Sequence, residues 1–240
     1  MQQRGITKMN IWYKELGFYN NPFSIKPMAF HDEVIGYDLD VVFNKIDNGE
    51  VLFIEGDYGK GKTTILKKII RRFGGKKRLV YYSCNRTASS IDFEKLIKNR
   101  HGFFSGLFSD DNNLILLLDE AQDISQEDSE KILDYYTKNF KSIILVGPNF
   151  DKIRFGNGLS KLISPNVIRL GELTEDDAIN IIRKRIGHTN FMQDDIIKMV
   201  FKKSAKNPRR LLKNCEDVCR YTIDQGYNKI KEEHVKKVLG

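Results

Sequence analysis

Residues 56–64 read Gly-Asp-Tyr-Gly-Lys-Gly-Lys-Thr-Thr, and this stretch gives the strongest indication of the fold that we expect for the chain. It has the spacing of a phosphate-binding loop, in which a glycine, four further residues and Gly-Lys-Thr follow one another. The glycines let the backbone curl so that its N–H groups point at a polyanion, and the following helix adds its positive N-terminal end. An apolar stretch at 50–56 leads into the loop and an amphipathic stretch at 62–73 leads out, as a buried strand and a helix should.

The predicted ATP site is therefore the whole loop: Gly56, Asp57, Tyr58, Gly59, Lys60, Gly61, Lys62, Thr63 and Thr64. We expect Lys62 to reach the β- and γ-phosphates and the Thr63 hydroxyl to ligate Mg²⁺. The alternative, a glycine-rich turn with an unrelated lysine, does not explain why a strand and a helix flank the loop.

A second motif, Leu-Ile-Leu-Leu-Leu-Asp-Glu, occupies residues 114–120. Ligands bind at the C-terminal tips of strands in parallel α/β sheets, which is where Asp119 and Glu120 would lie. We expect Asp119 to hold Mg²⁺, directly or through water, and Glu120 to take the proton from the attacking water. Many strands end in an aspartate that only caps a turn, but downstream of a phosphate loop the pattern is specific.

Apolar runs alternate with amphipathic stretches as far as Gly171, which predicts a parallel sheet covered by helices. The predicted helices are 62–73, 90–100 and 125–140, with Ser90 and Ser125 as N-caps. The predicted strands are 50–56, 78–83, 114–119, 142–147 and 166–171. The rest of the chain reads as helices, the first of them opened by a capping box of Thr174 and Asp177.

These patterns predict an α/β fold: a three-layer P-loop NTPase core with a parallel five-stranded sheet, plus a small all-helical C-terminal lid. The expected domains are an N-terminal lead-in (1–31), the nucleotide-binding core (32–171) and the lid (172–240).

The composition fits a globular protein, with 40% hydrophobic and 30% charged residues in 240. No apolar run approaches the roughly 20 residues that span a bilayer, and the N-terminus lacks the pattern of a signal peptide. We therefore expect a cytoplasmic protein without a membrane partner, whose three cysteines are reduced.

The net charge is +8, and basic residues gather at 67–78 and 198–213. Such a balance is compatible with a nucleic-acid partner. The alternative is that these lysine-rich faces are simply solvated.

The order of phosphate loop, Asp-Glu-Ala-Gln box, polar-ended fourth strand and helical C-terminal part resembles AAA+ ATPases. Within them the chain looks most like the branch of ExeA, TniB and MuB and, more distantly, the archaeal origin-recognition ATPases. The stretches that carry this resemblance are GFYNNPFSIKP (17–27), DEAQDIS (119–125), IILVGPN (143–149) and AKNPRRLL (205–212).

The resemblance implies further roles. Asn149 would be the sensor 1 residue that positions the attacking water, with Pro148 as the register alternative. Arg209 would be sensor 2, reaching the γ-phosphate from the lid with donors that match phosphate oxygens. Asn85 would restrain Glu120 or be an ordinary turn residue. The segment that resembles the adenine contact is Ile35, Gly36 and Tyr37.

Two departures from the family pattern stand out. Lys161 occupies the place where these proteins carry an arginine that acts on a neighbouring subunit, with Arg154 and Arg169 as off-register substitutes. A lysine offers charge but no bidentate fork, so hydrolysis would be slow or the assembly unusual. The stretch HGFFSGLF also brings three phenylalanines that would pack onto the sheet or contact DNA or a partner: Phe103, Phe104 and Phe108.

The resemblance implies an Mg-dependent ATPase that assembles or remodels partners on DNA, without sequence preference, as a homo-oligomer or with a protein partner. The alternative is a nucleotide-gated switch or scaffold that hydrolyses little. An RNA helicase, which the Asp-Glu-Ala-Gln string also suggests, would need two tandem cores, and everything after Gly171 reads as helical.

Overall fold

The structure is a computed structural model that describes residues 11–26, 36–75, 78–85, 90–99 and 113–240. These residues form two compact units, each with its own packing. The α/β unit is the continuous stretch 36–171. The helical unit is built from two separate stretches, 11–26 and 172–240.

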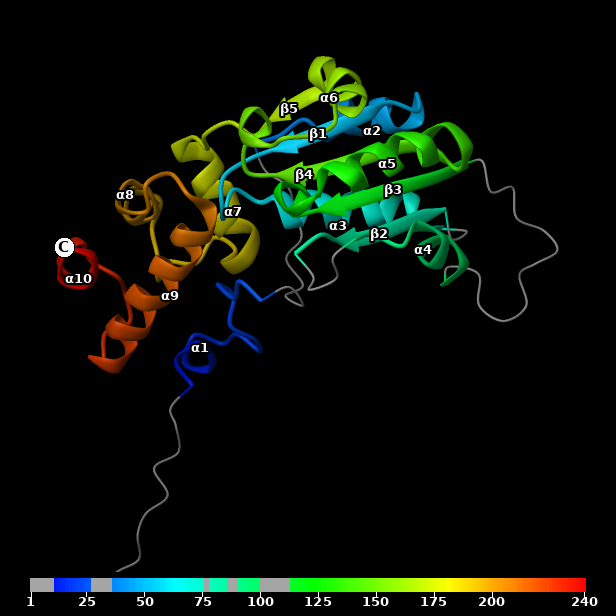
Figure 1. Ribbon diagram of the computed structural model, residues 1–240. Coiled ribbons are helices and arrows are strands. Elements are labelled where there is room, and N and C mark those ends of the chain that lie inside the picture. Colours follow the sequence, from blue (N-terminus) through cyan, green and yellow to red (C-terminus); the bar gives the residue numbers. More distant parts are fainter. Residues whose placement is uncertain (1–10, 27–35, 76–77, 86–89, 100–112) are drawn as a thin grey trace, which may run out of the picture. The chain divides into compact units, whose positions relative to one another are not determined.

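One parallel five-stranded sheet forms the centre of the α/β unit (Figure 1), in the order β2-β3-β4-β1-β5. Apolar side chains point to both faces of the central strands, which are almost completely buried, as expected for a sheet covered on both sides. The strands are β1 (Val51–Glu55), β2 (Leu79–Ser83), β3 (Leu114–Asp119), β4 (Phe140–Gly147) and β5 (Val167–Arg169).

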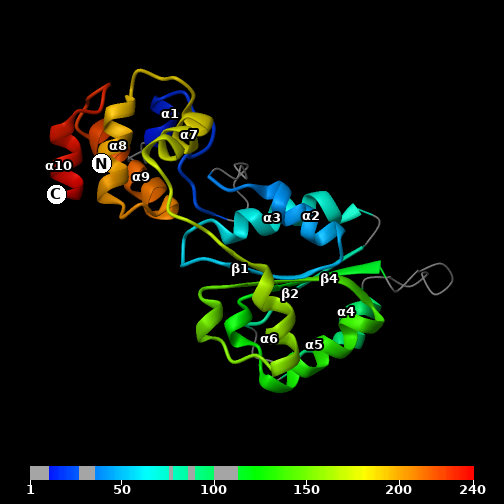
Figure 2. The same cartoon turned by 90° about the horizontal axis from the view of Figure 1, so that it is seen from above.

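Helices cover both faces of this sheet (Figure 2), so the unit has three layers. One face carries α2 (Leu39–Asp47) and α3 (Lys62–Phe73), where Phe43 in the middle of α2 makes an edge-on contact with Phe73 at the end of α3. The other face carries α4 (Phe93–Asn99), α5 (Gln126–Lys138) and α6 (Asn157–Ile163). The three-layer α/β prediction and the five parallel strands are confirmed.

Two local predictions need correction, and one helix was not predicted. The helix expected from Ser90 begins at Phe93, because Asp92 accepts the N–H of Lys95 and takes the capping role. Phe140, expected at the end of a helix, opens β4 instead and is buried in the core. The sequence did not single out α2, although its Asp38 accepts the N–H of Asp40 as an N-cap should.

Four helices make up the C-terminal part of the helical unit: α7 (Glu175–Ile186), α8 (Asp194–Lys203), α9 (Pro208–Asp224) and α10 (Glu232–Leu239). The capping box of Thr174 and Asp177 is present at the start of α7 as predicted. None of the helices in the described part of the chain is long and apolar enough to cross a membrane.

The N-terminal stretch is an integral part of the helical unit. Its short helix α1 (Trp12–Glu15) contacts α9, and the ring of Trp12 stacks on that of Phe23 at 6.1 Å between centroids. Both rings are buried. Arg185 of α7 donates to the carbonyl oxygens of Pro22 and Ser24 at 2.9 and 3.2 Å, which fixes the turn after α1.

Candidate functional site

The phosphate loop joins β1 to α3, and three of its glycines stand where a residue with a side chain would be strained or crowded. Gly59 and Gly61 have φ of 84° and 94°, a region that glycine adopts at no steric cost. Gly56 is needed for a different reason, since a Cβ there would lie 3.0 Å from Cδ1 of Leu170. The loop therefore has the backbone that a phosphate cradle requires.

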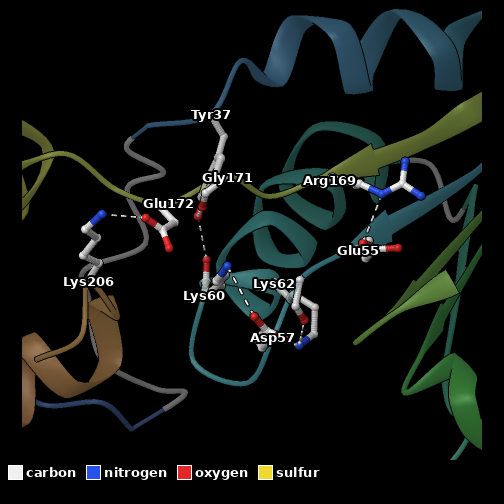
Figure 3. A network of polar contacts seen from close by, with 10 residues as sticks. Tyr37, Glu55, Asp57, Lys60, Lys62, Arg169, Gly171, Glu172 and Lys206 are labelled. Carbon is white, nitrogen blue, oxygen red and sulfur yellow. Dashed lines mark hydrogen bonds and ion pairs between the residues drawn. The ribbon is translucent and has the colours of Figure 1, made fainter. Parts of the chain in front are cut away.

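Lys62, the first residue of α3, turns back over this loop (Figure 3). Its Nζ donates to the carbonyl oxygens of Gly56 and Asp57 at 2.7 and 3.2 Å. Burial lowers the pKa of Lys62, while the charges of Glu120, Asp119 and Asp57 raise it. A half-buried ammonium with main-chain acceptors is well suited to bind an anion such as a phosphate.

The remainder of the loop is held by its neighbours. The Lys60 ammonium pairs with the Asp57 carboxylate at 3.3 Å. The hydroxyl of Tyr37 donates to the carbonyl oxygens of Lys60, at 3.1 Å, and of Gly171, at 3.4 Å (Figure 3). Tyr37 belongs to the predicted adenine segment, whose Ile35 lies outside the described residues. Tyr58 is 72% exposed, so its ring points into solvent.

Asp119 ends β3, beside β2. Its Oδ1 accepts the N–H of Glu120 at 2.9 Å and its Oδ2 accepts the hydroxyl of Tyr81 at 3.3 Å. Burial raises the pKa of Asp119 and the charge of Glu120 adds to this, whereas the two hydrogen bonds and Lys62 act in the opposite direction. The mutual influence of Lys62 and the two acids shows that the structure brings the predicted motifs together.

An Mg²⁺ ion prefers oxygen ligands, and the residues predicted to hold it supply a carboxylate and a hydroxyl. Asp119 is half-buried and Thr63 is exposed at the second position of α3. Both therefore fit the ion, and the ion would supply charge neutralisation to the phosphates.

Asn149 follows β4, the strand between β3 and β1, as the sensor 1 prediction requires. Its Oδ1 is buried and has no hydrogen-bond partner within the described residues. Such an orphaned acceptor is unfavourable unless a further donor reaches it, which a water at the phosphates would do. Pro148, the register alternative, is exposed and has no side-chain donor.

A carboxylate that sequence reasoning missed holds the backbone beside Asn149. Oε2 of Glu55, at the end of β1, accepts the N–H of Phe150 at 2.9 Å, and its Oε1 pairs with Nε of Arg169 at 3.2 Å (Figure 3). Arg169 also lies 3.5 Å from the Asp151 carboxylate. Since Arg169 is engaged within its own chain, it is a weak substitute for an arginine that acts on a neighbouring subunit.

The other predicted residues lie as follows. The Ser83 hydroxyl donates to Oδ1 of Asn85 at 2.8 Å, so this side chain bonds its own strand end. Arg209 belongs to the helical unit, where its N–H is bonded by Asn207 at the start of α9. Lys161 and Arg154 are exposed. The three phenylalanines Phe103, Phe104 and Phe108 fall outside the described residues.

Sequence reasoning also missed two polar side chains that touch the acids. Tyr81 bonds Asp119, and Nε2 of Gln122 donates to Oε2 of Glu120 at 2.8 Å. Gln122 stands inside the Asp-Glu-Ala-Gln box, so its spacing of two residues from Glu120 was a usable signal. Tyr81 gave no such signal in the sequence, because its contact with Asp119 depends on how β2 and β3 pair.

No family model and no curated protein matches the chain. Among solved structures it is similar to Cdc6p from Pyrobaculum aerophilum, with a TM-score of 0.67 at 18% identity over 91% of this chain and 70% of that one. The Thermotoga maritima RuvB Holliday junction branch migration motor gives 0.62 at 15% identity, over 85% and 68%. Drosophila ORC bound to DNA gives 0.64 at 13% identity, over 91% and 63%.

At identities this low, the structural similarity establishes a shared fold alone. That fold agrees with the sheet order, the phosphate loop and the acids at the tip of β3. The chain has the AAA+ P-loop NTPase fold of Cdc6 and RuvB.

Proposed function

We propose that this chain binds Mg·ATP at residues 56–64 and hydrolyses it. The observation that carries the proposal is the placement of Lys62, whose ammonium lies in a loop of left-handed glycines and within electrostatic reach of Asp119 and Glu120. In this reaction the oxygen of a water attacks the γ-phosphorus and the bond to the β-phosphate oxygen breaks. Glu120 takes the proton of the water, and Asn149 orients that water.

Removal of the Lys62 ammonium tests the binding step. Lys62→Ala is expected to abolish ATP binding in calorimetry while the far-UV circular dichroism stays that of the wild type, because the Lys62 ammonium bonds carbonyls of the loop and not the apolar core. Lys138→Ala is the control for the loss of an ammonium, since Lys138 pairs with Asp134 on α5, outside the loop. Wild-type affinity in Lys62→Ala, or equal losses in both variants, would contradict the assignment.

We further propose that the client is DNA, bound through phosphates and without sequence preference. The net charge of +8 supports this, as does the structural similarity to a branch migration motor and to an origin recognition complex bound to DNA. Within the basic stretch 198–213, Lys198 and Lys202 pair with Glu175, and Lys206 pairs with Glu172. The exposed residues of that stretch that make no ion pair in the described part of the chain are Lys203, Arg210 and Lys213.

ATP is expected to act through assembly, with the chain forming a homo-oligomer or joining a protein partner. The motifs at 119–125 and 205–212 favour the branch of ExeA, TniB and MuB, in which Arg209 would respond to the γ-phosphate. Arg154 is the remaining arginine for a neighbouring site, because it is exposed and forms no ion pair with any described residue. Mass measurement with and without ATP tests the assembly.

A second candidate function is a nucleotide-gated switch that hydrolyses little. It is favoured by Lys161 at the family's arginine position and by the engagement of Arg169 within its own chain. Steady-state phosphate release with and without DNA separates the two functions: turnover stimulated by DNA supports the ATPase, and tight ATP binding without turnover supports the switch.

A further inference from the structure

The backbone at Glu120 has a conformation that is unusual for this residue type. Its φ and ψ are 54° and 48°, in the left-handed region that disfavours side chains with a Cβ. Two hydrogen bonds hold it there: Oδ1 of Asp119 accepts its N–H at 2.9 Å, and its carbonyl accepts the N–H of Asp123 at 3.0 Å. These two bonds therefore fix the backbone of Glu120 and the direction in which its side chain leaves the main chain.

The carboxylate of Glu120 is held in addition by Gln122, two residues further along the same turn. Nε2 of Gln122 donates to Oε2 of Glu120 at 2.8 Å. An ionised carboxylate is an acceptor only, so the amide N–H occupies one of its lone-pair sites. Asn85, the residue that the family resemblance offers for this task, is bonded to Ser83 instead.

The other end of the Gln122 amide lies over the tip of β4. A Cβ placed on Gly147 would be 3.5 Å from Oε1 of Gln122. Because β4 runs between β3 and β1, this tip separates Glu120 from the phosphate loop. Gln122 therefore lies on the side of Glu120 that faces the phosphate loop. The Glu120 carboxylate must reach in this direction to meet a water at the γ-phosphate.

We propose that Gln122 is a positioning residue that restrains Glu120 in the resting protein and must release it before the water is deprotonated. The inference rests on the proposed ATPase function. While the bond is in place it fixes where the Glu120 carboxylate can reach, so the bond must break before the carboxylate can turn toward a water at the γ-phosphate. The restraint lies within one turn of the chain, so it acts in a single subunit.

The test replaces the amide with a side chain of similar length that cannot donate. Gln122→Met is expected to raise kcat about three- to tenfold, the range that the net free energy of one hydrogen bond allows. The dissociation constant of a non-hydrolysable ATP analogue, measured by calorimetry, should stay within about twofold, because the hydrogen bond of Gln122 goes to Glu120 and not to a described residue of the loop. Gln122→Ala should behave in the same way.

Two controls make the result specific. Gln126→Met places the same change at an exposed glutamine in the first turn of α5 and should leave kcat unchanged. Gln122→Met combined with Glu120→Gln should show no gain over Glu120→Gln alone, since the restraint acts only through the base.

The outcomes separate the two proposals. A kcat of Gln122→Met equal to or below that of an active wild type overturns the restraint and leaves the ATPase function standing. Analogue binding without turnover in the wild type, Gln122→Met and Gln126→Met alike overturns both. A gain that Gln126→Met shares also overturns the restraint, since it then does not depend on the contact with Glu120.

Discussion

Tyr81 of β2 and Asp119 of β3 lie two positions apart in the register of these adjacent parallel strands, and the tyrosine hydroxyl donates to Oδ2 of the aspartate at 3.3 Å. The bond partly offsets the burial that raises the pKa of Asp119. Burial therefore disfavours the charged form of the Asp119 carboxyl in the nucleotide-free protein, and a bound cation would stabilise that form.

A pH dependence follows from that shift. Because the pKa of Asp119 is higher in the folded protein than in the unfolded chain, the folded state binds the proton more tightly. The contribution of this group to the free energy of unfolding is then favourable at low pH and declines as the pH rises above the ordinary value of 3.8. Asp119→Asn is expected to remove this decline and raise the urea midpoint of the nucleotide-free protein at pH 7. Asp123→Asn, exposed in the next turn, is the control, and a pH-independent offset between Asp119→Asn and wild type would contradict the account.

Hydrolysis should depend on Glu120 far more than binding does. Glu120→Gln keeps the size of the side chain but cannot take a proton, so turnover should fall by about 100-fold or more. Calorimetry should still detect Mg·ATP binding, since the loop at 56–64 is untouched. An unchanged rate of phosphate release would place the base elsewhere.

DNA affinity should depend on salt and on Lys203 and Lys213, which form no ion pair with any described residue. Contacts to phosphates release counterions, so the binding constant should fall with a log–log slope of about −0.9 for each phosphate neutralised. In fluorescence anisotropy with Mg·ATP, Lys203→Gln with Lys213→Gln should reduce the magnitude of this slope by about 2. Lys198→Gln with Lys202→Gln is the matched control, because both lysines pair with Glu175 and should change the slope less. No binding at low salt would leave a protein as the client.

The stability of the helical unit should depend on its N-terminal stretch. Phe23 is 1% exposed and stacks on Trp12, so Phe23→Ala should lower the free energy of unfolding by about 3–5 kcal/mol. Trp12 is the single tryptophan of the chain, which makes its fluorescence in a urea titration a local probe. Tyr19→Ala, at a side chain that is 89% exposed, should leave the midpoint unchanged. Equal effects of both changes would mean that the stretch is not docked.

The turn before α9 should become more stable with glycine. Ala205 and Lys206 have φ of 49° and 54°, and a left-handed residue with a Cβ is disfavoured by about 1–2 kcal/mol. Glycine relieves this at a cost of about 0.5–1 kcal/mol in the unfolded chain, so Ala205→Gly should raise the melting temperature slightly. The same substitution at Ala178, buried within α7, should lower it. A lower melting temperature in Ala205→Gly would show that the turn is not strained.

The fold was predictable because its signals are local. Each central strand is a continuous apolar run, and the glycines and Lys62 stand at a fixed spacing between β1 and α3. The contacts that complete the site are not local, because they depend on the strand order. Glu55 meets Arg169 only because β5 pairs with β1, and Tyr81 meets Asp119 only because β2 pairs with β3. The left-handed backbone of Glu120 also had no signal, since glycine is the residue that usually marks such a position.

The division of the helical unit into two stretches sets an order of events during synthesis. Trp12 and Phe23 are made early, but α9, against which the stretch packs, is made only after the whole α/β unit. At typical rates of translation the two rings wait on the order of ten seconds for that partner. During this interval they are exposed apolar surface on a nascent chain, where a chaperone or a second growing chain can reach them. The part of the protein most exposed to misassembly is thus the helical unit, although the stretches that build it stand at the two ends of the sequence.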